Sequence, residues 1–416
     1  MLVRLALALF ALQSGFHGFT ASLPVALARA GVADEEIGVI VGLAALVQVP
    51  AAFAGGALVD RFGGLRLMAV GAVAYFIGAG VMLLPGVDPA GDKLPFAVAR
   101  ISQGIGIAVT LPAALSLVAR LVTPDRRGFG LAFVGSAQNL TLIAMPPLSL
   151  AVLGRGSSLD PVALLVIGIV GLGVLLLVAA PIRLRPATIH EHPEAPARSS
   201  HAPGTKPPVL ASRWLGFAFR REWIPLLVIT LLYVAHWGVV TSYLPQRAEL
   251  AGADVGLFFV ADGIAVLALR IPSGWLADRF RPRWVVLTGL LVTALAIGLL
   301  VLPPTTPVLV VAGALTGGGA GLVQTAVLVV MSRRSTDADR GSAFAMLSAA
   351  LAGALVLGSI GAAPIIASAG FEATILATII GLACATVVAL ADPRLAHSAR
   401  SRTLPAPAVP GRDERP

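Results

Sequence analysis

The residues most able to do chemistry in this chain are polar side chains that interrupt long apolar segments. Gln13, His17 and Thr20 follow one another at intervals of four and three within the apolar stretch Leu2 to Ala28. This spacing places all three on one face of a helix. A polar group in apolar surroundings persists where it faces protein groups or water. The spacing therefore predicts a polar wall of a binding site.

Similar stripes recur in three other apolar segments. They consist of Tyr233, His236 and Tyr243, of Arg100, Gln103 and Thr110, and of Thr316 and Gln324. Each histidine taken alone could be a hydrogen-bonded packing residue. Because His17 and His236 occupy matching places in the two halves of the chain, we interpret the pair as part of a solute-binding cavity.

Asp262 is the carboxylate that lies furthest inside an apolar segment, and Arg270 follows two turns later. A carboxylate that is desolvated in one state and beside a cation in another can bind and release a proton. Asp262 and Arg270 are therefore our first candidates for proton coupling. Two alternatives stay open. Asp262 could form a permanent ion pair with Arg270 or Arg100, or the proton could be carried by His17 or His236, since imidazole titrates near neutral pH.

The amino-acid composition indicates which kind of structural element positions these residues. Of 416 residues, 57% are hydrophobic and 12% are charged, and the mean hydropathy is +0.90. These values exclude an ordinary soluble domain. A helix needs roughly 20 apolar residues to cross a bilayer, and the chain divides into twelve such stretches. The predicted spans are Leu2 to Ala28, Ile37 to Val59, Leu67 to Leu84, Leu94 to Leu121, Phe129 to Leu153, Pro161 to Ile182, Trp223 to Pro245, Val255 to Ala277, Trp284 to Leu302, Pro307 to Met331, Ser342 to Ala367 and Ala373 to Ala391.

The distribution of charge predicts the orientation of the spans. If both termini are cytoplasmic, the cytoplasmic segments hold 24 of the 30 Lys and Arg residues, as the positive-inside rule requires. The outer loops then hold Arg29, Lys93, Arg155 and Arg247. The first span could also be a cleaved signal peptide, but Gln13, Ser14 and His17 interrupt its apolar run. A lysine-poor, arginine- and alanine-rich composition favours a bacterial cytoplasmic membrane.

An internal repeat divides the chain into two halves. The sequence from Gly56 to Gly63, G-A-L-V-D-R-F-G, recurs from Gly274 to Arg281 as G-W-L-A-D-R-F-R, at an offset of 218 residues. The repeat indicates a tandem duplication of six helices. We therefore predict an N-terminal bundle over residues 1–182, a cytoplasmic linker over 183–222, a C-terminal bundle over 223–391 and a cytoplasmic tail over 392–416.

These residues resemble the major facilitator superfamily, whose G-x-L-x-D-R-x-G signature follows the second span and is often repeated after the eighth. A second signature of the family, R-x-x-Q-G-x-G, is present from Arg100 to Gly106. The motif that proton-driven drug exporters carry in the fifth span is degraded here to Gly135, Asn139 and Met145-Pro146-Pro147. The resemblance implies an all-α integral membrane protein in which twelve transmembrane helices form two pseudo-symmetric six-helix bundles.

The resemblance also implies a cytoplasmic latch that opens and closes with the transport cycle. Its residues would be Gly56, Asp60, Arg61, Gly274, Asp278, Arg279, Arg127 and Arg340. The glycines would allow close helix crossing, and the aspartates would pair with the arginines in one conformation. The alternative is that these charges only determine topology. In this family the first, fourth, seventh and tenth helices line the cavity, which agrees with the polar stripes.

Several other functions are disfavoured by the sequence. An intramembrane aspartyl protease needs two carboxylates, and only Asp262 lies well inside a predicted span. No H-E-x-x-H or ATP-binding motif is present, and His190, His192 and His201 lack the frame of a metal site. We expect no cofactor, no resident metal, no nucleic acid and a monomer. The predicted function is secondary transport of a small, partly hydrophobic solute by proton-coupled efflux. Coupled uptake, facilitated diffusion, a transporter-like sensor or a polytopic enzyme are the alternatives.

Overall fold

The computed structural model describes residues 1–88, 90–123, 126–179, 223–335 and 340–395, and within these ranges every regular element is a helix. The first half contains α1 (Leu2–His17), α2 (Ser22–Arg29), α3 (Asp34–Phe62), α4 (Gly64–Gly80), η1 (Val81–Leu83), α5 (Lys93–Leu121), α6 (Arg127–Leu153) and α7 (Asp160–Val178). The second contains α9 (Ile224–Leu250), α10 (Val255–Arg279), α11 (Pro282–Leu299), α12 (Thr306–Arg334), α13 (Arg340–Ser359), α14 (Ala363–Ala391) and η3 (Pro393–Leu395). The predicted linker and tail fall almost entirely outside the described residues.

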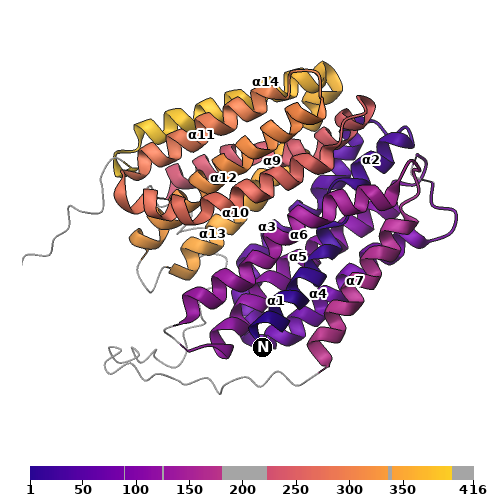
Figure 1. The fold of residues 1–416 in the computed structure, drawn as a ribbon, viewed down its shortest axis with the longest axis horizontal. Coiled ribbons are helices and arrows are strands. Elements are labelled where there is room, and N and C mark those ends of the chain that lie inside the picture. Colours follow the sequence, from indigo (N-terminus) through magenta and orange to yellow (C-terminus); the bar gives the residue numbers. More distant parts are fainter. Residues whose placement is uncertain (89, 124–125, 180–222, 336–339, 396–416) are drawn as a thin grey trace, which may run out of the picture.

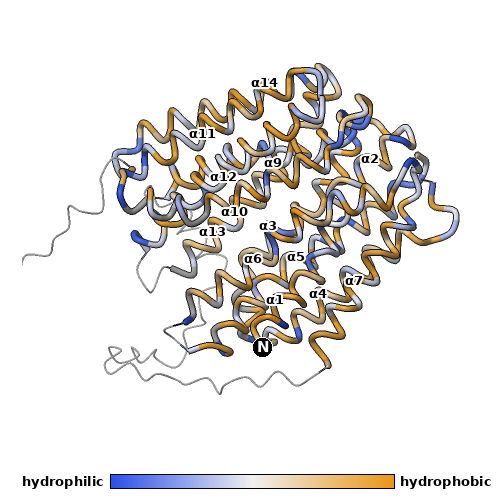
Figure 2. Tube along the Cα trace, viewed as in Figure 1, coloured by the Kyte–Doolittle hydropathy of each residue, from blue (hydrophilic) through white to orange (hydrophobic). Residues whose placement is uncertain are grey.

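The helices have the length and composition of membrane spans. Eleven described segments are long and apolar enough to cross a bilayer, with α1 and α2 counted as one, and Val255–Leu269 of α10 is a shorter apolar helix. Helices satisfy their own backbone hydrogen bonds, as a span in hydrocarbon must. Large apolar side chains such as Leu175, Leu291 and Val387 are exposed on the surface. Figure 2 shows the same pattern, with hydrophobic colour along the helices and hydrophilic colour concentrated toward their ends. The chain is a multi-pass membrane protein.

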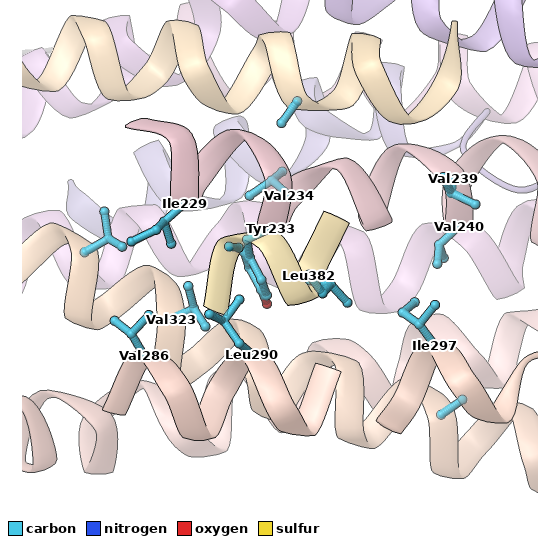
Figure 3. Close-up of a cluster of buried hydrophobic side chains, with 14 of the residues drawn as sticks. Ile229, Tyr233, Val234, Val239, Val240, Val286, Leu290, Ile297, Val323 and Leu382 are labelled. Carbon is cyan, nitrogen blue, oxygen red and sulfur yellow. The ribbon is translucent and has the colours of Figure 1, made fainter. Parts of the chain in front are cut away.

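Two hydrophobic cores organise the helices into two bundles. One core includes Leu9, Tyr75 and Val166 from α1 to α7, and the other includes Tyr233 and Leu290 from α9 to α14. Figure 3 shows part of the second core, where Tyr233, Leu290, Val323 and Leu382 come together from four different helices. In Figure 1 the two bundles lie next to each other, approach at the upper right and separate toward the lower left, where the N-terminus lies.

The first and the eleventh spans differ from the sequence prediction. The first breaks at residues 18–21, where the N–H groups of Phe19 and Thr20 turn back to residues three positions earlier. Pro24 has no N–H to donate to the carbonyl of Thr20 and its ring crowds that carbonyl, so a continuous helix is disfavoured there. The eleventh span ends at Ser359 rather than Ala367, because Pro364 restarts the helix.

The last helix is also bent. The predicted twelfth span begins at Ala373, whereas α14 begins at Ala363 and contains a kink at Gly370, where φ is +79°. A positive φ is readily adopted only by glycine. The kink separates the short segment before Gly370 from the membrane-crossing part that follows it.

Candidate functional site

A cavity of about 460 Å³ lies between the two bundles. Its walls come from α3, α5, α6 and α13, and they are mostly apolar. The polar lining side chains are Gln48, Gln138 and Ser348, and none of the lining residues is charged. The lining reaches Gly55 near the end of α3 and Phe344 near the start of α13. The cavity is therefore nearest the end of the molecule at which the N-terminus lies.

Contacts between the bundles close the opposite end. The guanidinium of Arg29 donates to Oε1 of Glu249 at 2.6 and 3.0 Å, and also to the carbonyls of Gly154 and Gly156. Nε2 of Gln246 donates to Oδ1 of Asp34 at 3.2 Å. The bonds between Arg29 and Glu249 and between Gln246 and Asp34 join helices that belong to different bundles. The bundles are thus bonded to each other at one end, and the cavity lies toward the other.

Two glycines allow the bundles to approach closely at this closed end. A Cβ at Gly38 of α3 would lie 2.5 Å from Cζ of Tyr243, and one at Gly42 would lie 2.5 Å from Cγ1 of Ile360. The hydroxyl of Tyr243 donates to the carbonyl of Ser359 at 2.5 Å. The sequence predicts that Tyr243 lies in the cavity wall. In the structure it packs against the other bundle at the closed end.

The first polar stripe is partly satisfied by a residue that the sequence analysis missed. The hydroxyl of Tyr75 on α4 donates to Oε1 of Gln13 at 3.3 Å and lies 3.4 Å from Oγ1 of Thr110. All three side chains are buried. The structure therefore brings Gln13 and Thr110 together, but in the interior of the first bundle rather than on the cavity surface.

Arg100 is the one buried Lys or Arg among the described side chains, with 3% of its surface exposed. Its guanidinium donates to Oε1 of Gln103 at 2.7 Å and to the carbonyl of Val41 at 3.1 and 3.4 Å, and it lies 4.9 Å from the ring centre of Phe16. His17 lies within electrostatic range of Arg100. The proposed pairing of Arg100 with Asp262 is not observed.

Gln103 and His17 near Arg100, and Thr20 three residues after His17, have buried polar atoms without a hydrogen-bond partner in the described structure. They are both ring nitrogens of His17, Oγ1 of Thr20 and Nε2 of Gln103. His17 is the last residue of α1 and Thr20 lies in the break between α1 and α2, which was not predicted from the sequence. A break in a transmembrane helix frees backbone groups and is a common feature of solute sites in transporters.

The second bundle holds the remaining predicted residues. His236 contacts the carbonyl of Tyr233 through Nδ1, and its buried Nε2 has no partner in the described structure. The hydroxyl of Tyr233 accepts from Oγ1 of Thr293 at 3.5 Å. Thr316 is buried and donates to the carbonyl of Ala312 at 2.7 Å. The side chain of Gln324 is exposed, unlike the other members of the stripes.

Asp262 is buried on α10, where 3% of its surface is exposed, and its Oδ1 has no hydrogen-bond partner in the described structure. A Cβ at Gly317 of α12 would lie 2.8 Å from the carbonyl carbon of Asp262, so α10 and α12 cross closely at this residue. Tyr233 lies within electrostatic range. The side chain of Arg270, the other predicted partner, lies outside the described part.

Most of the predicted latch also lies outside the described side chains. This applies to Gly56, Asp60, Gly274, Asp278, Arg127 and Arg340. Arg61 and Arg279 are described and exposed, and their guanidinium carbons lie 5.3 Å and 5.2 Å from the ring centres of Phe62 and Trp275. In the first copy of the motif the ring belongs to the residue after the arginine, and in the second to a residue one helical turn before it.

The polar residues that line the cavity, Gln48, Gln138 and Ser348, were missed by the sequence analysis. Gln48 and Gln138 lie in the middle of apolar spans, which is the signal that could have found them. The polar stripes predicted from the sequence lie on the first, fourth, seventh and tenth spans, whereas these residues belong to the second, fifth and eleventh.

The fold and the cavity define a class of protein, a multi-pass helical membrane protein whose two bundles enclose a space that is reached from one end. Comparison with protein families gives the same result. The family profile "Major Facilitator Superfamily" matches residues 5–254 and 227–412. The chain belongs to the major facilitator superfamily, and its fold is that of a transporter.

Solved structures of that fold resemble the chain over nearly its whole length. A D-xylose-proton symporter is 18% identical, with a TM-score of 0.68, over 94% of this chain and 96% of that one. The xylose transporter XylE from E. coli, in an inward-open conformation, is 20% identical, with a TM-score of 0.66, over 93% and 94%. A peptide transporter in complex with sulfate is 17% identical, with a TM-score of 0.70, over 94% and 92%. At these identities the likeness concerns the fold.

Proposed function

We propose that the protein exports a small organic solute by alternating access and couples this movement to protons. The observation that carries the proposal is the cavity between the bundles, which lies at one end while contacts close the other. A solute bound in such a cavity changes sides when the closed end opens and the hollow end closes. The apolar walls fit a solute with a hydrophobic body.

Asp262 is the proposed proton carrier. It is a buried carboxylate with an oxygen that no described group satisfies, and a buried carboxylate is tolerated in a membrane where it serves a function. Its backbone lies at the close crossing of α10 and α12. A movement of this crossing would change the surroundings of Asp262 and thus its proton affinity.

We further propose that the termini are cytoplasmic and that the protein resides in a bacterial cytoplasmic membrane. Arg29, Lys93, Arg155 and Arg247 lie on helix ends or turns at the closed end of the molecule. The described basic residues at the opposite helix ends, such as Arg61, Arg120 and Arg281, are at the end with the N-terminus, and positive charge is retained on the cytoplasmic side. The cavity would then face the cytoplasm, where an exporter loads its solute.

The test is a measurement of internal pH in proteoliposomes that contain a pH-sensitive dye and start without a pH gradient. A screen adds small organic compounds outside. Exchange of solute for protons makes the interior more alkaline, whereas cotransport makes it more acidic, and facilitated diffusion leaves the pH unchanged. Asp262→Asn should abolish the pH response, while Asp160→Asn, at an exposed carboxylate, should retain it.

Each alternative gives its own result. Acidification that requires the protein would replace export with coupled uptake. Solute entry without any pH change, in the wild type and in Asp262→Asn alike, would leave a facilitator in which Asp262 is structural. A response that survives in Asp262→Asn but not in His236→Gln would move the proton to the histidine. Binding without any vectorial movement of solute would indicate a sensor.

A further inference from the structure

Arg100 carries a buried positive charge that no carboxylate in the described part of the chain neutralises. It forms no ion pair with a described carboxylate, and its partners are the neutral oxygens of Gln103 and Val41 together with the ring of Phe16. The acidic residues of the adjoining helix α3 lie in its end turns, with Asp34, Glu35 and Glu36 in the first and Asp60 in the last. A buried charge is costly unless it is paired. An anion bound beside Arg100 would offset this cost.

The count of hydrogen-bond donors supports the same conclusion. A guanidinium has five N–H donors, and three of them are used in the bonds to Val41 and Gln103. Two N–H groups remain, which match the two oxygens of a carboxylate. Nε2 of Gln103, Oγ1 of Thr20 and a ring nitrogen of His17 add further donors without a partner in the described structure. The surroundings of Arg100 have donors in excess and few acceptors.

The position of Arg100 connects it with the cavity. Ile107 and Leu111 of α5 line the cavity, and Arg100 is two turns from Ile107 on the same face of the helix. On α3, Val41 is in the same relation to the lining residue Gln48. Two turns of helix span about 10 Å. Arg100 and its partner Val41 thus lie on the same helix faces as the cavity-lining residues, two turns closer to the closed end.

We propose that the transported solute is a small organic acid whose carboxylate binds Arg100 while its apolar body lies in the cavity. This inference rests on the proposed transport function and names the charge of the solute. The two remaining N–H groups of Arg100 would hold the carboxylate, with His17, Thr20 and Gln103 as additional donors. The uncharged walls formed by Ile107, Leu111 and α13 would contact the rest of the molecule.

Binding at Arg100 would also reach the seal between the bundles. The carbonyl that Arg100 holds belongs to Val41, and the next residue, Gly42, packs against Ile360 of the other bundle. A carboxylate that draws the guanidinium away from Val41 would break a hydrogen bond next to the contact between Gly42 and Ile360. The anion site and the closed end are therefore adjacent in the chain.

The test compares carboxylates with their uncharged amides on the purified full-length protein. Benzoate, phenylacetate and hexanoate are each paired with benzamide, phenylacetamide and hexanamide, and binding is measured by thermal unfolding and calorimetry. A ligand of the native state raises the unfolding temperature. At least one carboxylate should stabilise the wild type while its amide does not.

Arg100→Gln should lower the affinity for that acid roughly thirtyfold or more, as loss of a buried charge partner does. Arg100→Lys should retain part of it, and Arg155→Gln, an exposed control, should retain all of it.

Other results would overturn the assignment. One is equal stabilisation by an acid and its amide, and another is no stabilisation by any of the three acids. A third is the same shift in unfolding temperature with potassium chloride at equal ionic strength. The last is an unchanged affinity for the acid in Arg100→Gln. The comparison of acid with amide uses the wild-type protein, so it holds even if the Arg100 variants do not fold. Binding of the acid without transport in proteoliposomes would contradict the proposed function and leave the anion site standing.

Discussion

The two bundles carry opposite buried charges at the same crossing of helices. In the first bundle Arg100 of α5 reaches across to the carbonyl of Val41 on α3. In the second, Asp262 of α10 lies against Gly317 of α12. At the repeat offset of 218 residues, the counterpart of Asp262 on α3 is Ala44. Gly104 of α5 packs against Ala44 as Gly317 of α12 packs against Asp262, so these two helices correspond at an offset of 213 and the counterpart of Arg100 is Gly313. The two halves of the duplicated fold thus differ, since one holds a buried cation and the other a buried carboxylate.

This difference separates two tasks that one transporter must perform. The cation lies beside donors without partners and fits an anionic group of a solute. The carboxylate lies at a close helix crossing, where a small movement changes its solvation. Helix packing at the two crossings also differs. In the second bundle, Gly313, Gly317 and Gly321 of α12 all pack against α10, whereas in the first bundle Gly104 of α5 packs against Ala44 of α3.

The largest expected effect is on the crossing of the second bundle. Gly317→Val would place a branched side chain against the backbone of Asp262, since even a Cβ would lie 2.8 Å from its carbonyl carbon. Overpacking of this kind costs about 1–3 kcal/mol. Thermal unfolding in detergent should show a clear loss of stability. Gly298→Val is the matched control, because a Cβ there meets no atom within 4 Å. Equal losses in both variants would mean that the crossing is not tight.

A smaller effect is expected in the polar core of the first bundle. Tyr75→Phe removes the hydroxyl that bonds Gln13 at 3.3 Å and lies 3.4 Å from Thr110, so its loss should cost about 1 kcal/mol. Tyr233→Phe in the second bundle removes only an acceptor 3.5 Å from Thr293 and should cost less. Unfolding temperatures of the two variants decide the order. A larger loss in Tyr233→Phe would reverse this part of the comparison.

The smallest effect is expected where the bundles meet. Arg29 and Glu249 are partly exposed, and the ion pair at 2.6 Å between them joins the bundles at the closed end. Pairs of this kind contribute about 0.2–1 kcal/mol. Arg29→Glu should therefore weaken closure and change the transport rate a few-fold, and the addition of Glu249→Arg should recover part of it. Strictly additive effects in this double-mutant cycle would show that the two residues act independently.

The sequence predicts the spans well and the local breaks poorly. Apolar runs bounded by charges set the lengths of the helices, and the repeated motif gives the two halves. Pro24 and Pro364 carry the signals for the breaks in the first span and before the twelfth, but a proline within a span can also be accommodated without a break, as Pro112 is in α5. The choice between these outcomes depends on packing against neighbouring helices.

The candidate site could be predicted only in part for a related reason. Spacing identifies which residues share a helix face, and it correctly groups Arg100 with Gln103. It does not show that Tyr75 turns toward Gln13, or that Gln48 and Gln138 line the cavity, because these facts depend on how separate helices are rotated against one another. Long-range packing decides which polar face is enclosed in a bundle and which faces the cavity.

The central claim is that the two ends of the molecule open in alternation, and distances between spin labels on opposite bundles test it most directly. In a Cys384→Ser background, one pair is placed at the cavity end with Arg120→Cys and Ser332→Cys, and another at the closed end with Arg155→Cys and Leu250→Cys, all at exposed positions. Electron spin resonance in nanodiscs would then compare acidic with alkaline buffer, with and without benzoate. The account predicts that one distance lengthens as the other shortens. Two distances that stay fixed, or that change in the same direction under every condition, would contradict it.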